Sequence, residues 1–139
     1  MIRIILFLIL FSSITGCNKI KDKIIETQAL NFITVGQWKV ASFSESGTDH
    51  SNEFSPYSFQ FRTNYTVDAI KNGTKEISGT WIGTEANSVV TIQSDFPQNA
   101  IAPLPFLNGT FLVQDAGLNY VEATKTQNGV VSSLRLEKI

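Results

Sequence analysis

The sequence predicts an all-β domain, an eight-stranded antiparallel up-and-down barrel that follows a signal peptide and a short tether. Three observations predict this fold. Segments in which apolar and polar residues alternate recur from residue 36 to residue 139. Two Asn-Gly pairs, Asn72-Gly73 and Asn128-Gly129, mark tight hairpins, because both residue types tolerate positive φ. No segment between the strands predicts a helix, which parallel strands would need for their crossovers, so we expect antiparallel pairing throughout.

The first residues have the pattern of an export signal. A single positive charge at Arg3 precedes an unbroken apolar run over residues 4–11, which is shorter than the roughly 20 residues that span a bilayer. The tetrapeptide that ends at Cys17, Ile-Thr-Gly-Cys, resembles the lipobox of bacterial lipoproteins. The resemblance implies cleavage before Cys17, the only cysteine, and its acylation with chains such as palmitate. A free thiol in an ordinary signal peptide is the alternative.

These features divide the chain into a signal peptide over residues 1–16, a lipidated cysteine and tether over residues 17–33, and a barrel domain over residues 34–139. Two or three acyl chains would hold the protein on a membrane, because each buried methylene contributes about 0.8 kcal/mol. Asn18 follows the cysteine, where an aspartate would retain a lipoprotein in the inner membrane, and no acidic run follows that would mark surface export. We therefore expect a cell-envelope protein that is anchored in the outer membrane and faces the periplasm.

The charge of the chain argues against a nucleic-acid partner. Loss of Arg3 with the signal peptide leaves 10 of the 11 basic side chains against 12 acidic ones, a net charge near −2. A nucleic-acid surface would be clearly basic. The expected partners are the membrane, through the lipid on Cys17, and a small hydrophobic ligand.

Four strands are expected in the first half of the domain, at residues 38–43, 57–62, 65–70 and 77–82. The first places Trp38 and Val40 on one face and Lys39 and Phe43 on the other. In the second, three aromatic residues alternate with polar ones, which is the clearest half-buried strand pattern in the chain. A turn separates the second strand from the third, and the first Asn-Gly hairpin precedes the fourth.

Four more strands are expected at residues 88–94, 107–114, 119–125 and 130–138. The last one places Leu134 and Leu136 on one face. Residues 95–106 form a long irregular segment that contains three prolines. Closing eight strands into a barrel removes the exposed sheet edges and leaves an interior just wide enough for packed side chains or one small ligand.

Three short segments carry a resemblance to a known family. Residues 36–38 (Gly-Gln-Trp) resemble the Gly-x-Trp signature that opens lipocalin-type barrels, residues 79–81 (Gly-Thr-Trp) repeat it, and residues 108–111 (Asn-Gly-Thr-Phe) echo it. The ending at residues 134–138 is similar to the last strand of small lipocalin-like lipoproteins of Bacteroidetes-type bacteria. The resemblance covers about residues 34–139 and implies a lipocalin-like barrel in a family mostly of undetermined function.

The resemblance also suggests a role for one arginine. In larger lipocalins the first tryptophan packs at the closed barrel end beneath an arginine from a late strand. Arg135 is the only arginine near the C-terminus, so the resemblance makes it the candidate to cover Trp38.

The aromatic residues are the candidate ligand site. We expect an apolar cavity lined and gated by residues of the strands and of the 95–106 segment: Trp38, Tyr57, Phe59, Phe61 and Trp81 as lining, with Ile101 and Leu104 as the gate. The chain would then bind a small hydrophobic molecule in the cell envelope. The alternative is a solid barrel core, in which case the protein is an interaction module whose surface is the 95–106 loop and the 46–53 loop.

Catalytic and metal chemistry find little support in the sequence. The single histidine, His50, lies in a polar loop beside Asp49 and Glu53, which is a poor site for a transition metal without cysteine. No Gly-x-Ser-x-Gly elbow or glycine-rich phosphate loop is present, and no pattern selects a pair of carboxylates. We expect no enzyme activity, no cofactor and no metal.

Overall fold

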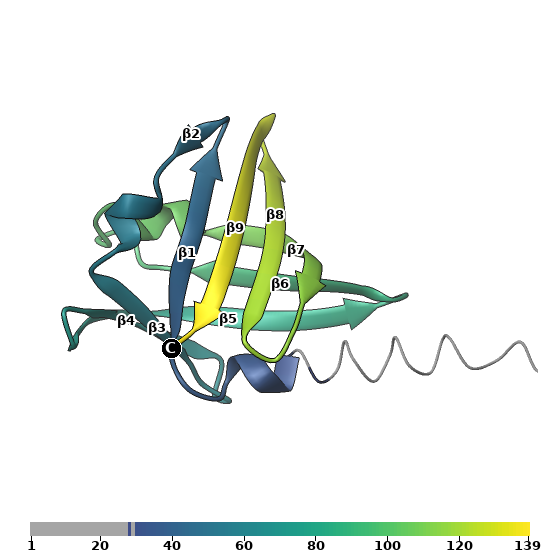
Figure 1. The fold of residues 1–139 in the computed structure, drawn as a ribbon, viewed down its shortest axis with the longest axis horizontal. Coiled ribbons are helices and arrows are strands. Elements are labelled where there is room, and N and C mark those ends of the chain that lie inside the picture. The colour runs from purple at the N-terminus through teal and green to yellow at the C-terminus, as the bar shows by residue number, and fades with distance from the viewer. Residues whose placement is uncertain (1–27, 29) are drawn as a thin grey trace, which may run out of the picture.

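A computed structural model gives the fold and describes residue 28 and residues 30–139 (Figure 1). The predicted signal peptide and the lipidation of Cys17 lie outside the described residues, as does the tether up to residue 27. Within the described part, no helix has both the length and the apolar character that a membrane crossing requires.

The described chain is a closed antiparallel barrel. Its strands are β1 (Trp38–Glu45), β2 (Thr48–Asp49), β3 (Tyr57–Phe61), β4 (Thr66–Lys71), β5 (Thr74–Ala86), β6 (Val89–Asp95), β7 (Gly109–Ala116), β8 (Tyr120–Gln127) and β9 (Val130–Lys138). Two 3-10 helices, η1 (Ser51–Phe54) and η2 (Leu104–Leu107), lie between strands. Each strand from β3 to β8 pairs with the next along the chain, and β1 pairs with both β3 and β9. β2 only extends the end of β1, so the predicted eight-stranded barrel is confirmed.

Closure depends mainly on the first and last strands. β1 and β9 are paired at seven positions, from Trp38 opposite Lys138 to Glu45 opposite Ser132. The contact of β1 with β3 has a single paired position, Trp38 opposite Phe59. Figure 1 shows β1, β9 and β8 side by side, with β5, β6 and β7 crossing them at a steep angle. The core fills the space between these two layers.

A bulge in β1 changes which side chains face inward. The register with β9 shifts between Val40 and Ser42, so one extra residue is accommodated there. Trp38 and Val40 are buried as expected, but Phe43 is also buried, with 1% of its surface exposed. The prediction that Phe43 shares the outer face with Lys39 was wrong, because the bulge reverses the alternation after Val40.

The predicted hairpins form, and one more was missed. Asn72 and Gly73 have φ values of 50° and 81°, and Asn128 and Gly129 have 52° and 77°, as a two-residue turn of this kind requires. A similar turn at Asn87-Ser88 lacks glycine and therefore has no clear signal in the sequence. The predicted strand at residues 77–82 was therefore too short, because β5 runs from Thr74 to Ala86, directly before this turn.

Two predicted boundaries are corrected by packing. Tyr65 was expected to begin a strand, but it lies in the β3–β4 turn with φ of 66° and is 60% exposed. The folded unit also begins before residue 34. Ile33 is completely buried, and its carbonyl accepts a hydrogen bond of 2.8 Å from Nε1 of Trp38. The helical turn at residues 30–33 therefore belongs to the barrel and closes one of its ends.

A buried carboxylate on β4 organises the outer surface near the β3–β4 turn. Asp68 is 4% exposed and accepts hydrogen bonds from Ser78 at 2.6 Å and from Arg62 at 2.7 Å. Lys75 lies 3.4 Å away. The hydrogen bond from Ser78, followed by the hydrogen bond and charge of Arg62, holds the pKa of Asp68 below its ordinary value despite burial. This network ties β4 to β5 and to the end of β3.

Candidate functional site

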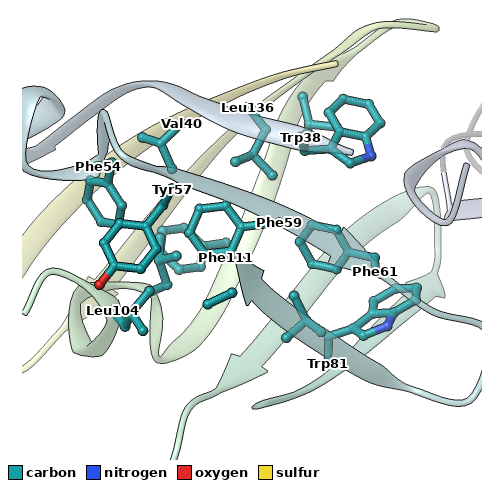
Figure 2. Close-up of a cluster of buried hydrophobic side chains, with 14 of the residues drawn as sticks. Trp38, Val40, Phe54, Tyr57, Phe59, Phe61, Trp81, Leu104, Phe111 and Leu136 are labelled. Atoms are coloured by element: carbon teal, nitrogen blue, oxygen red, sulfur yellow. The ribbon is translucent and has the colours of Figure 1, made fainter. Parts of the chain in front are cut away.

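The predicted site residues gather in the barrel interior, with one exception. Figure 2 shows the aromatic side chains of β1, β3 and β5 pointing into a shared cluster. Six of the seven predicted residues are at most 7% exposed, namely Trp38, Tyr57, Phe59, Phe61, Trp81 and Leu104. Ile101 is 57% exposed and lies on the outside of its loop. The structure therefore brings the predicted lining together but does not place Ile101 as a gate.

The interior aromatics pack directly against one another. The rings of Phe61 and Trp81 meet edge to face with centroids 5.5 Å apart, and Phe59 contacts Phe96 edge-on at 6.3 Å. Tyr57 stacks on Phe59 at 6.2 Å. Such arrangements are favourable for aromatic pairs and leave little space between them.

One inward-facing group at the rim is polar. The hydroxyl of Tyr57 donates a hydrogen bond of 2.6 Å to Oε2 of Glu76. Burial, followed by this hydrogen bond, raises the pKa of Tyr57 from 10.0 to about 12. The phenol is thus held neutral and oriented toward β5, which is a structural role.

The remaining void in the barrel is small. Its volume is about 30 Å³, and its walls include Phe59, Phe61 and Phe111. A void of this size holds one or two water molecules, whereas pockets for small ligands measure roughly 300–1,000 Å³. The only polar side chain in its wall, Ser94, donates a hydrogen bond to the carbonyl of Leu107. The interior is therefore a packed core rather than a ready-made ligand cavity.

Residues from outside the strands complete this core. Phe54 of η1 and Leu104 of η2 are 1% and 0% exposed, and Phe96, just after β6, is 3% exposed. Neither Phe54 nor Phe96 was predicted to lie in the core. For Phe54 the available signal was an isolated large apolar residue in a polar loop, which often anchors such a loop to the core, whereas Phe96 lies in an apolar segment that offers no such signal.

The two predicted interaction loops form a single cap at one barrel end. We define the cap as residues 46–56 and 96–108. The ring of His50 lies 4.6 Å from that of Phe106, and Phe43 stacks on Phe106 at 5.6 Å. The cap is therefore one continuous surface, held by aromatic contacts between its two segments.

The polar residues around His50 stabilise the cap. Nδ1 of His50 lies 2.6 Å from Oε1 of Glu53, whereas Asp49 accepts hydrogen bonds from the backbone and side chain of Ser51. These bonds from Ser51 lower the pKa of Asp49. Among the described residues, no group of histidine, cysteine or carboxylate side chains is arranged to hold a metal ion.

A buried lysine in the barrel interior is hydrogen-bonded to the cap. Lys125 points inward from β8 and is 7% exposed. Its ammonium donates hydrogen bonds to the carbonyls of Phe106 at 2.9 Å and Asn108 at 2.6 Å, and it lies 4.9 Å from the ring centre of Phe111. Burial lowers the pKa of Lys125. The lysine thus supplies hydrogen-bond donors to two backbone carbonyls at the end of η2.

The cation over the first tryptophan is not the predicted one. Arg135 points outward from β9, where it pairs with Glu122 and Glu137 and lies 4.7 Å from the ring centre of Tyr120. The cation near Trp38 is Lys138, with Nζ 5.7 Å from the indole ring. The assignment of Arg135 was wrong because Leu134 and Leu136 face the interior, which turns Arg135 away from it.

A shallow groove opens at the barrel end opposite the cap. It has a volume of about 310 Å³ and is lined by residues of the N-terminal turn, the β3–β4 turn and β5: Leu30, Asn31, Thr34, Thr63, Tyr65, Trp81 and Gly83. A Cβ atom at Gly83 would collide with Cδ2 of Leu30. Glycine at this position therefore allows the N-terminal turn to sit close against β5.

Eight antiparallel strands that follow one another and close on themselves define an up-and-down barrel, the architecture of lipocalins. A crystal structure of a lipocalin-like protein from Bacteroides uniformis ATCC 8492 is similar, with a TM-score of 0.49, 13% sequence identity and coverage of 77% of this chain and 99% of that one. A crystal structure of an uncharacterized protein from Bacteroides eggerthii DSM 20697 has a TM-score of 0.49, 14% identity and coverage of 76% and 99%. The fold assignment rests on strand order and closure rather than on these similarities. No protein-family model and no curated protein matches the sequence.

Proposed function

We propose that this chain is a lipid-anchored protein of the cell envelope whose solid barrel acts as an interaction module and binds a protein partner through the cap. The observation that supports this proposal is the interior void of about 30 Å³, which is too small for a ligand unless side chains move. Function is then expected at the surface, and the cap presents an apolar side chain there.

The cap has the properties of a preorganised binding surface. Ile101 is 57% exposed, while Phe96 and Leu104 on either side of it are buried and fix the loop to the core. The backbone N–H of Ala100 bonds to the carbonyl of Pro97 at 2.8 Å, and that of Leu104 bonds to the carbonyl of Ile101 at 3.1 Å. A loop already held in place loses little entropy on binding, which favours affinity.

The charge distribution of the cap fits a protein partner. Residues 96–106 contain no charged side chain, whereas Asp49 and Glu53 lie in the neighbouring segment. An apolar centre beside a polar, charged rim is the usual layout of a protein interface.

The membrane anchor in this proposal is the lipid on Cys17. Its support is the lipobox-like tetrapeptide and the position of the single cysteine after a short apolar run. The proposed location is the outer membrane, with the barrel on the periplasmic side.

The test is site-specific photo-crosslinking in living cells. A photoreactive residue at position 101 should give one defined adduct with an envelope protein, and the same residue at Ile82, 48% exposed on β5, should not. Ile101→Ser should then weaken binding of the purified partner at least tenfold, and Ile82→Ser should leave it unchanged. Equal adducts from positions 101 and 82 would refute the cap as the binding surface. Equal affinities of Ile101→Ser and Ile82→Ser for the partner would refute it as well.

Binding of a small hydrophobic molecule inside the barrel is the alternative. Its support is the nearly apolar wall of the void, in which Ser94 is the only polar side chain. A ligand would have to displace side chains such as Phe59 and Phe111. Native mass spectrometry on residues 28–139 purified without detergent tests this idea. A reproducible added mass that disappears in Phe59→Ala would favour the ligand, and a clean apo mass after incubation with envelope lipids would exclude it.

A further inference from the structure

We propose that the barrel rests on the bilayer surface with the end opposite the cap, so that the cap points away from the membrane. This inference depends on the lipid anchor of the proposed function and adds an orientation to it. The partner is the phospholipid surface itself, and the contact consists of exposed apolar side chains on the turns at that end.

The topology defines two distinct ends. In an up-and-down barrel, successive turns alternate between the ends, so the turns at residues 62–65, 87–88 and 117–119 lie at one end with the N-terminal turn at residues 30–33. We call this the tether end. The cap and the two Asn-Gly hairpins lie at the other end. Figure 1 shows the N-terminal turn near the C-terminus, below β8 and far from β2.

The tether end carries more exposed apolar side chains than the cap end. Tyr65 and Leu118 lie in two of its turns and are 60% and 66% exposed. Val89 directly follows the third turn and is 46% exposed, and Val35 follows the N-terminal turn and is 56% exposed. Every turn at this end therefore has an apolar side chain in it or beside it that the barrel itself does not cover.

Two of these turns are fastened to neighbouring strands by backbone hydrogen bonds. The carbonyl of Tyr65 accepts a bond of 3.0 Å from the backbone of Trp81. The backbone N–H of Lys138 bonds to the carbonyl of Asn119, beside Leu118, at 2.8 Å. Tyr65 also lines the groove of about 310 Å³ together with residues of the N-terminal turn. Tyr65 and Leu118 are thus held on turns that are fixed to the barrel, and Tyr65 shares a groove with the N-terminal turn.

The residues at this rim suit the region between lipid headgroups and acyl chains. A tyrosine combines an apolar ring with a polar hydroxyl and is favoured at membrane surfaces. Lys138 extends over Gly36 and Trp38 at the same end, and the side chain of Arg62, at the start of the Tyr65 turn, is 52% exposed. Both cations can approach lipid phosphates while the apolar side chains enter the interface.

The length of chain between the barrel and the lipid identifies the membrane as the occupant. Residue 28 lies eleven residues after Cys17. Even fully extended, these residues span at most about 36–40 Å, which keeps the barrel within about one bilayer thickness of the surface. The chain enters at the tether end, so this is the end that a lipid on Cys17 draws toward the membrane.

The test uses the full lipidated chain in vesicles of phosphatidylethanolamine and phosphatidylglycerol. Because acylated Cys17 cannot react with a thiol reagent, an environment-sensitive fluorophore can be placed on one engineered cysteine. Tyr65→Cys and Leu118→Cys report on the tether end. Ile101→Cys, whose parent side chain has a similar exposure of 57%, and Asn72→Cys report on the cap end. Thermal unfolding checks each variant, and Leu118→Cys carries the test if Tyr65→Cys is unstable.

We expect the fluorophores at positions 65 and 118 to shift to shorter emission wavelengths and to be quenched by brominated lipids, and those at positions 101 and 72 to do neither. Equal emission at both ends without lipid quenching would overturn the orientation while leaving the anchor intact. A blue shift that depends on protein concentration but not on brominated lipid would show that a second copy covers this end, and would also overturn it. Reaction of the reagent with Cys17 in the unmodified chain would refute the lipid anchor, and the orientation with it.

Discussion

Replacing Phe111 with alanine tests whether the barrel interior is a solid core. Phe111 is 3% exposed and borders the void of about 30 Å³. Phenylalanine-to-alanine changes in cores destabilise proteins by about 3–5 kcal/mol. We expect a value near 4 kcal/mol, because the walls are strands locked in hydrogen-bonded register and cannot collapse far into the new space. A domain of this size has a stability of about 5–15 kcal/mol, so the variant should remain folded.

The same substitution should create a binding site that the parent protein lacks. Apolar cavities of about 150 Å³ stay dry and accept benzene-sized molecules. Benzene at ten times its dissociation constant would then restore about 1.4 kcal/mol of stability to Phe111→Ala and none to the parent protein. Denaturant unfolding followed by tryptophan fluorescence measures both effects.

The adjacent residue provides the control. Leu112 lies on the same strand but faces outward and is 41% exposed, so Leu112→Ala should change the free energy of unfolding by less than about 1 kcal/mol. Equal losses for the two variants would refute the inward packing of Phe111. Stabilisation of the parent protein by benzene would refute the solid core.

Three further predictions concern ionisable side chains. Lys125→Met should lower the free energy of unfolding by about 1–3 kcal/mol because it leaves two cap carbonyls without donors, whereas Lys39→Met, whose parent side chain is 53% exposed, should have little effect in the same denaturant assay. The raised pKa of Tyr57 contributes stability that is fully present below pH 10.0 and should be lost as the pH rises toward about 12. In a pH titration followed by phenolate absorbance, the ionisation step at the highest pH should be missing in Tyr57→Phe. The lowered pKa of Asp68 stabilises the fold above about pH 4, and this stabilisation is lost as the pH falls further. The unfolding midpoint of Asp68→Asn should therefore change less between neutral and acidic pH than that of the parent protein.

The strands of this barrel could be predicted because their side chains follow simple periodicities. Alternation marks β3, and the Asn-Gly pairs fix the hairpins around Gly73 and Gly129. The bulge in β1 could not be predicted, because an extra residue between Val40 and Ser42 leaves no compositional mark. The same holds for the Asn87-Ser88 turn, in which residues other than glycine adopt positive φ.

The candidate site could be predicted only in part. Sequence periodicity identified the inward aromatics such as Phe59 and Trp81, and they are buried as expected. Whether they enclose a cavity depends on the total volume placed inside the barrel. Phe54 and Phe96 contribute to that volume from irregular segments in which no periodicity indicates direction. The choice between a cavity and a solid core therefore required the structure.

The pairing of β1 with β9 has a consequence for the order in which the chain can fold. β1 has two paired positions with the short β2, only one with β3 and seven with the last strand, β9. During synthesis or export, β1 must therefore wait, with its backbone donors and acceptors largely unpaired, until nearly every other residue has emerged. Contacts that join distant parts of a chain slow folding, and an unpaired strand is prone to associate with other chains. A barrel of this design gains its stability in one late step, so any factor that holds the early strands apart until β9 arrives would act as its chaperone.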